Sequence, residues 1–235
     1  MPQVSYTALD GGSVQLSAEV SLNSPPTSIV VATVGEREHE FTSGAPWFGQ
    51  SVADEFGVDL AEEYSFQGGR LSLGEALQVD PLDGRESVFK LAVWEGEMFS
   101  LETGYYEGDL GFLIALLDMF TIAESGGGIS ISPVNPAATP LASRGGKQPQ
   151  LLKWVGGLGL LEIWQRTSEG DAELPPWEGA SVAGGELFHE MDMAGQPVYL
   201  LVGDDAITRI YGDKEATSSK MLEATEGLSA HWTAG

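Results

Sequence analysis

The most apolar stretch of the chain, residues 111–123, predicts a helix. Large apolar residues stand at positions 113, 116, 117 and 120, which is the i, i+3, i+4, i+7 spacing of one helical face. Other apolar side chains fill most of the remaining circumference, so we expect a helix over about 109–123 that is buried nearly all round. Asp109 is placed to cap its N-terminus, and the glycines that follow Ser125 are placed to end it.

The first forty residues alternate between apolar and polar positions, which predicts β-strands. Val14, Leu16 and Ala18 are separated by polar residues, and the β-branched run 29–34 is typical of a central strand. Residues 87–94 and 97–106 are joined by Glu95 and Gly96, a pair that favours a tight turn, and they predict a β-hairpin.

Elsewhere the pattern predicts shorter elements. We expect an acidic surface helix over 51–64 with Ser51 as its cap, and a terminal helix over 214–232. Residues 71–83 fit either a short helix or an extended loop. Further strands are expected at 129–132, 158–166, 181–190, 196–202 and 206–211.

This order of elements predicts an α+β fold. Strands follow one another in runs and do not alternate with helices, so the sheets should be largely antiparallel and packed on the buried helix at 109–123 and a C-terminal helix. We expect one domain over residues 1–235. A division within the loop 133–149 is the alternative, because a loop of that length is unusual inside a compact domain.

The charge balance narrows the choice of partners. The chain has 35 acidic and 11 basic residues, a formal net charge of −24. Such a surface repels phosphates and anionic lipid headgroups, so we expect neither nucleic-acid nor membrane binding. The expected partners are other protein subunits, either copies of this chain or different chains with basic surfaces.

The absence of cysteine excludes disulfides and thiolate metal sites. The first residues lack the basic and apolar blocks of a signal peptide, and no stretch is long enough to span a bilayer. We therefore expect a cytoplasmic protein, or one that joins a particle, such as a virion, assembled in the cytoplasm.

Catalytic motifs are missing from the sequence. The GxSxG, GxGxxG and GxxxxGK[ST] patterns do not occur, so we name no catalytic residue and no cofactor. His189, Glu190 and Asp192 are weak candidates for metal ligands, because alternation along a strand would place the histidine and the two acids on opposite faces. A solvated strand edge is the simpler interpretation of this stretch.

Two groups of residues suggest protein–protein contacts. Three of the basic residues lie in or just after the loop 133–149 and could dock on an acidic surface: Arg144, Lys147 and Lys153. Trp47 and Trp177 stand beside prolines in expected loops, and Tyr105 and Tyr106 end the hairpin. Large aromatic side chains dominate binding energy at many interfaces, so these four are interface candidates.

These observations favour a non-enzymatic structural or assembly subunit of a larger complex, such as a phage tail, baseplate or neck component of a virion. One alternative is a soluble acidic binding or regulatory module for a basic protein or a small ligand. A carboxylate- or metal-dependent hydrolase is the other, because a chain with 35 acids always contains carboxylate pairs that could act in catalysis.

Overall fold

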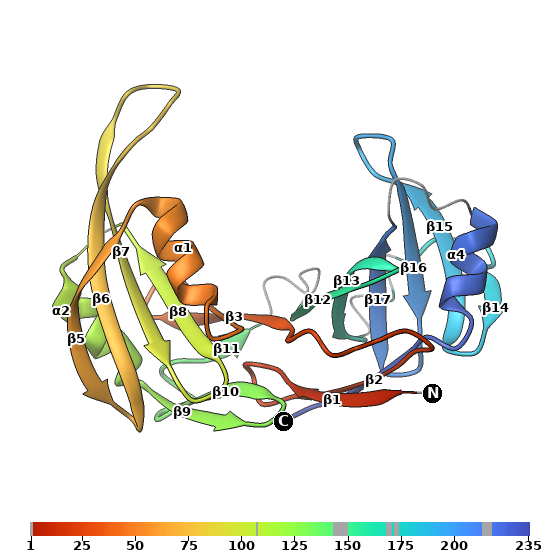
Figure 1. Cartoon of the computed structure of the whole chain (residues 1–235), viewed down its shortest axis with the longest axis horizontal. Helices are drawn as coiled ribbons and strands as arrows, with labels where there is room; N and C mark the ends of the chain where they lie inside the picture. Colours follow the sequence, from red (N-terminus) through yellow and green to blue (C-terminus); the bar gives the residue numbers. More distant parts are fainter. Residues whose placement is uncertain (1, 107, 143–149, 168–170, 172–173, 213–217) are drawn as a thin grey trace. The chain divides into compact units, whose positions relative to one another are not determined.

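The chain folds mainly into antiparallel β-structure (Figure 1). The computed structural model describes residues 2–106, 108–142, 150–167, 171, 174–212 and 218–235. Within the structure, strands account for 53% of the residues and helices for 11%. The expected α+β class is therefore wrong, and the protein is a mostly β protein with short helices.

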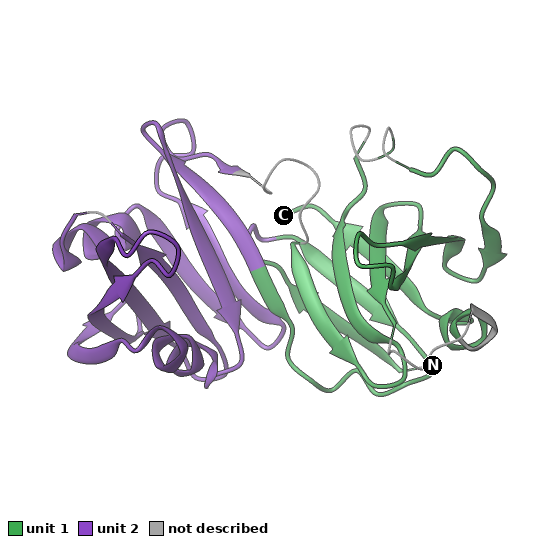
Figure 2. Ribbon diagram, turned by 90° about the horizontal axis from the view of Figure 1, so that it is seen from above, with its two compact units in different colours: residues 1–8, 12–28, 143–235 green, residues 9–11, 29–142 purple. Residues whose placement is uncertain are grey.

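The chain divides into two compact units, coloured separately in Figure 2. Unit 1 holds residues 1–8, 12–28 and 143–235, and unit 2 holds residues 9–11 and 29–142. Strand β3 (Thr27–Val34) begins in unit 1 and continues in unit 2. Each unit has its own hydrophobic core.

Unit 2 is built on an antiparallel sheet with helices on both faces. The strand order is β3-β4-β8-β7-β6-β5, with β11 (Leu141–Ala142) also paired to β3. The other strands of this sheet are β4 (Arg37–Gly44), β5 (Asp59–Phe66), β6 (Gly69–Val79), β7 (Glu86–Glu95) and β8 (Ser100–Tyr105). A separate hairpin consists of β9 (Phe120–Ser125) and β10 (Gly128–Pro133).

Alternation along β6 and β7 explains why two helices are needed in unit 2. Leu73 and Trp94 point to one face and pack with the leucines of α2 (Leu110–Leu117). Leu91 and Val93 point to the other face and pack with Ala53 of α1 (Phe48–Phe56).

Unit 1 contains two sheets. The smaller has the order β1-β2-β18, formed by β1 (Gln3–Thr7), β2 (Ser13–Ser17) and β18 (Ser229–Thr233). The larger has the order β14-β15-β16-β17-β13-β12. Its strands are β12 (Leu151–Val155), β13 (Gly159–Gln165), β14 (Ala180–Val182), β15 (Gly185–Met191), β16 (Pro197–Val202) and β17 (Ala206–Tyr211). Leu16, Leu161 and Met221 share one core, which also takes in helix α4 (Ser218–Thr225).

The predicted buried helix over 109–123 is wrong in length and in burial. Helix α2 ends at Leu117, and strand β9 begins at Phe120. The Asp109 cap is confirmed, since its carboxylate accepts from Phe112 N at 2.9 Å. Only one face of the helix is fully buried, because α2 lies on the outside of the sheet and turns Ala115 to solvent.

The other predicted helices also give way to strands. The structure replaces the helix over 51–64 with α1, whose cap position is Trp47 and not Ser51, followed by β5. The terminal helix over 214–232 is replaced by α4 and β18. In both places a glycine with positive φ ends the helix: Gly57 at 65° and Gly227 at 83°. The undecided residues 71–83 lie largely in β6.

Several strand predictions are confirmed. The hairpin at 87–94 and 97–106 is β7 and β8, paired from Glu95 opposite Ser100 to Lys90 opposite Tyr105. The expected strands at 196–202 and 206–211 are β16 and β17. No helix in the described ranges is long and apolar enough to cross a membrane.

Candidate functional site

Strands β6 and β7 extend beyond both of their neighbours in the sheet of unit 2. The pairing of β5 with β6 stops at Glu75, and the pairing of β7 with β8 stops at Lys90. The β6–β7 pairing itself continues as far as Val79 opposite Glu86. Residues 76–89 therefore form a two-stranded ribbon, which we call the arm and which projects from the sheet in Figure 1 (yellow).

One face of the arm is apolar and exposed. Leu77 and Val79 are 60% and 57% exposed, and Val88 lies directly opposite Leu77. On the same face Glu86 lies opposite Val79, and the Glu75–Lys90 pair separates Leu77 from Leu73, which is fully buried in the core of unit 2. At the tip, Leu82 is 95% exposed. Large apolar side chains grouped on a surface in this way make the arm a candidate interaction site.

The opposite face holds the root of the arm to unit 2. The Phe89 ring lies 4.6 Å from Phe56 and 5.1 Å from Tyr106, measured between ring centroids. Gln78 Nε2 donates to the Phe56 carbonyl at 2.6 Å. The arm thus has an anchored face and an exposed apolar face.

The turn at the tip of the arm is ordered by its own hydrogen bonds. Asp80 N donates to Arg85 O at 2.9 Å, and Gly84 N donates to Asp80 O at 2.8 Å. The side chains of Asp80 and Asp83 accept from Leu82 N at 2.7 Å and from Arg85 N at 2.9 Å. These local bonds fix the backbone and leave the Leu82 side chain pointing into solvent.

The β7–β8 turn has the opposite character. The Glu124 carboxylate, from β9, accepts hydrogen bonds from the backbone N–H groups of Glu97, Met98 and Phe99 at 2.8, 2.9 and 2.8 Å. A Cβ added to Gly96 would lie 2.5 Å from a Glu124 oxygen, so the carboxylate would have to move from the position in which it accepts these three bonds. This turn is held against the β9–β10 hairpin, and its contacts are structural.

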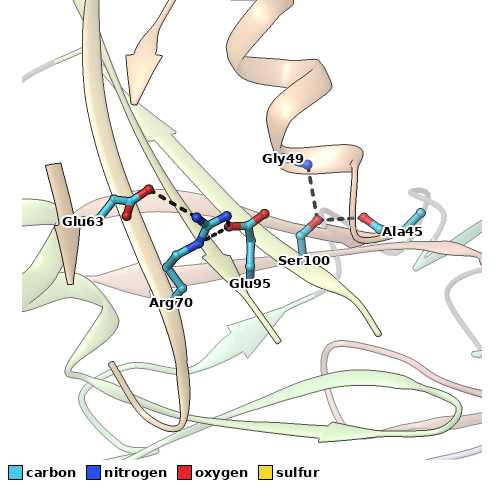
Figure 3. Close-up of polar contacts among 6 residues, drawn as sticks. All are labelled: Ala45, Gly49, Glu63, Arg70, Glu95 and Ser100. Atoms are coloured by element: carbon cyan, nitrogen blue, oxygen red, sulfur yellow. Dashed lines mark hydrogen bonds and ion pairs between the residues drawn. The ribbon is translucent and has the colours of Figure 1, made fainter. Parts of the chain in front are cut away.

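The polar contacts near the β5–β6 hairpin are also satisfied internally. Arg70 bonds to Glu63 at 3.2 Å and, through Nε, to Glu95 at 2.8 Å (Figure 3). Ser100, fully buried, donates to Ala45 O at 2.9 Å and accepts from Gly49 N at 3.2 Å, which ties α1 to β8. The exposed ion pairs contribute little stability, and Arg70 is already engaged by two carboxylates.

Glu102, on β8, carries a largely buried carboxyl group. Burial, together with the negative charges of Glu40 and Glu55, raises the pKa of Glu102 to about 8. The Glu102 Oε2 atom is buried without a hydrogen-bond partner. Within the described ranges, however, no three potential metal-ligating side chains converge closely enough to hold an ion. The raised pKa of Glu102 makes the stability of the fold depend on pH.

Tyr105 and Tyr106 differ in exposure. Tyr105 packs in a ring cluster, 5.1 Å from His39 and 5.2 Å from Phe112, and its hydroxyl accepts from Arg37. Burial, and secondly the charge of Arg37, lowers the pKa of His39. Tyr106 is 50% exposed at the root of the arm. Of the two, Tyr106 is the one whose ring is available to a partner.

Lys153 lies in the core of unit 1 and not on its surface. It is 1% exposed, its Nζ donates to the carbonyl and the hydroxyl of Ser24, and it lies 4.8 Å from the centroid of the Tyr6 ring. Burial lowers the pKa of Lys153 to about 8. The lysine holds a surface loop, so the expected basic docking group loses this member. Its other members, Arg144 and Lys147, lie outside the described residues.

Trp47 and Trp177 are 66% and 53% exposed. Both rings are therefore accessible, and their role at an interface stays a prediction.

The candidate metal ligands of β15 are not brought together. The His189 ring lies 4.9 Å from Tyr199, and Glu190 occupies the next position of the strand. Asp192 orders the following turn, accepting from Ala194 N at 2.9 Å and from Gln196 N at 2.7 Å. His189 thus packs against Tyr199, and the Asp192 carboxylate is engaged by its own turn.

Sequence reasoning missed the arm. The signal was present in the alternation of Leu71, Leu73, Leu77 and Val79, followed by the turn residues 81–84.

The chain matches no protein-family model, no curated protein and no solved structure.

Proposed function

We propose that the protein is a structural assembly subunit that docks on neighbouring copies of itself through the arm. The observation that carries the proposal is the exposed apolar face of the arm, with Leu77, Val79 and Leu82 all more than half exposed. Burying apolar area stabilises a contact by about 25 cal/mol per Å². Isolated two-stranded ribbons are also marginally stable in water, so a partner would stabilise the arm itself.

The geometry of the tip supports docking rather than a purely structural role. Four of its backbone N–H groups, those of Asp80, Leu82, Gly84 and Arg85, donate within the turn, so little conformational entropy is lost when Leu82 enters a partner's pocket. The open outer edges of residues 76–79 and 86–89 offer a partner strand further backbone hydrogen bonds. A tip that is ordered by its own hydrogen bonds and exposes a leucine suits repeated contacts between subunits.

The charge of the chain predicts how such an assembly responds to salt. Copies that each carry a net charge of −24 repel one another at low ionic strength. Added salt screens this repulsion and leaves the apolar contact in place. A particle in which many copies pack side by side meets these conditions, so a virion part, such as a phage tail, baseplate or neck protein, is the specific form of the proposal.

Sedimentation velocity on the full chain tests this function. From about 0.05 M to about 1 M NaCl, we expect the mass to rise from the 24.9 kDa monomer to oligomers. The variant with Leu77→Ser, Val79→Ser and Leu82→Ser should remain monomeric throughout. The matched control, Met98→Ser with Met119→Ser, removes exposed apolar groups of unit 2 outside the arm and should associate normally. A wild-type chain that stays monomeric at every salt concentration would contradict the proposal.

A further inference from the structure

A groove in unit 1 lies between the edge strand β14 and the helix α4, which are neighbours in Figure 1. Its volume is about 480 Å³. Three lining residues come from the edge of the sheet and three from the helix and its end: Ser181, Val182, Ala183, Leu222, Glu223 and Glu226.

The strand side of the groove has backbone groups that could form hydrogen bonds with a partner. β14 pairs with β15 on one side and is the last strand in the order of its sheet within the described residues. In an antiparallel strand, the N–H and C=O groups of alternate residues point away from the paired neighbour. An extended segment from another chain can therefore add to this edge, as happens where peptides lie between an edge strand and a helix.

The side chains on the helix side of the groove determine which kind of partner side chain fits there. Val182 packs partly against the core of unit 1, and Leu222, 41% exposed, faces the same groove. Glu223 and Glu226 are three residues apart, which places them on one side of the helical turn. The groove thus combines an apolar floor with an acidic rim, which suits a long basic side chain.

We propose that this groove binds an extended segment of a basic partner protein, which adds a strand to β14 and places a lysine or arginine between Val182 and Leu222. The aliphatic part of that side chain covers the apolar floor, and its cationic group reaches Glu223 and Glu226. Charge complementarity identifies the segment as basic, because Glu223 and Glu226 at the groove would repel an acidic segment. The proposal stands on unit 1 alone and does not depend on the arm.

A labelled peptide tests the groove directly. The probe is fluorescein-Thr-Lys-Thr-Lys-Thr-amide, whose alternation puts both lysines on one face of an extended strand, and its binding to the full chain is followed by anisotropy at low salt. We expect Glu223→Gln with Glu226→Gln to weaken binding at least about tenfold, the loss of two charge-assisted contacts. The matched control, Glu36→Gln with Glu38→Gln, removes the same charge from exposed positions of unit 2.

A second probe separates strand addition from general attraction between opposite charges. The same peptide methylated on every backbone nitrogen keeps its lysines but cannot donate backbone hydrogen bonds, so it should lose most of its affinity. Equal weakening by the two glutamine pairs, or undiminished binding of the methylated peptide, would overturn the proposal. Because the peptide is tested on monomers, and also on the serine variant of the arm, failure of the groove and failure of self-assembly give different results.

Discussion

The two ends of strand β7 lead into hairpin turns with opposite properties. The β7–β8 turn is held by the Glu124 carboxylate through three backbone N–H groups. The tip of the arm, between β6 and β7, is ordered only by bonds within its own residues, and Leu82 there is 95% exposed. A turn can thus be ordered by a contact with a neighbouring hairpin or by its own hydrogen bonds, and the self-contained turn leaves its leucine far more exposed than Met98 in the β7–β8 turn, which is 45% exposed.

Removing the carboxylate that holds the β7–β8 turn should have the largest effect on stability. Glu124→Ala leaves three backbone donors without their charged acceptor, and we expect it to lower the free energy of unfolding by about 2–3 kcal/mol. Urea denaturation followed by circular dichroism measures the loss. At the arm tip, Asp83→Ala removes one exposed bond and is the matched control. Equal losses in both variants would remove the distinction between the turns.

Ionisation of the buried Glu102 carboxyl group is expected to destabilise unit 2, and a substitution of Glu102 tests this. Its folded pKa of about 8 lies above the ordinary 4.5, so the cost of ionisation is fully present above pH 8 and is relieved as the pH falls towards 4.5. We expect Glu102→Gln to be more stable than wild type by about 1–3 kcal/mol above pH 8, with the difference vanishing near pH 4.5. A difference independent of pH would contradict this account.

A methyl group at Gly96 tests the close approach of Glu124. Gly96→Ala would place Cβ 2.5 Å from a Glu124 oxygen, and we expect a loss of about 1–2 kcal/mol. In a Glu124→Ala background the same substitution should cost much less, because the clash is gone. Additive losses in the double-mutant cycle would show that the two residues do not interact.

The smallest effect is expected for the exposed residue of the arm tip. Leu82→Ser removes a side chain that is 95% exposed, so the unfolding free energy of the monomer should change by less than about 0.5 kcal/mol. Denaturation at a low protein concentration checks this. A larger loss would mean that Leu82 packs within its own chain, which the account denies.

The strands could be predicted from the sequence where one face of a sheet is buried. Val14 and Leu16, which alternate with polar residues, lie in β2. Strand β5 escaped prediction because most of its residues are exposed, so no apolar period marks it. The stretch 111–123 misled for another reason. Its apolar residues belong to two elements, a helix that ends at Leu117 and a strand that begins at Phe120. Applying the helical spacing to the whole stretch treats these two elements as one helix.

The candidate site was less accessible to sequence reasoning. The sequence makes Trp47 and Trp177 interface candidates, and both side chains are exposed. Lys153 was expected at the surface, yet its ammonium group is buried against Tyr6 and Ser24, a contact between distant parts of the chain. The arm was missed because it is defined by how far the β6–β7 pairing extends beyond the pairings with β5 and β8. Those lengths depend on the register between strands, which the sequence pattern does not give.

Hydrogen exchange of the wild-type chain, measured by mass spectrometry in dilute low-salt and concentrated high-salt solutions, tests the central claim most directly. The arm, residues 76–89, should exchange quickly in the dilute sample and become protected on association, because its open edges and apolar face are then covered. Residues 95–100 of the β7–β8 turn should exchange equally in both samples. Association without protection of the arm, or protection of the β7–β8 turn alone, would contradict the account.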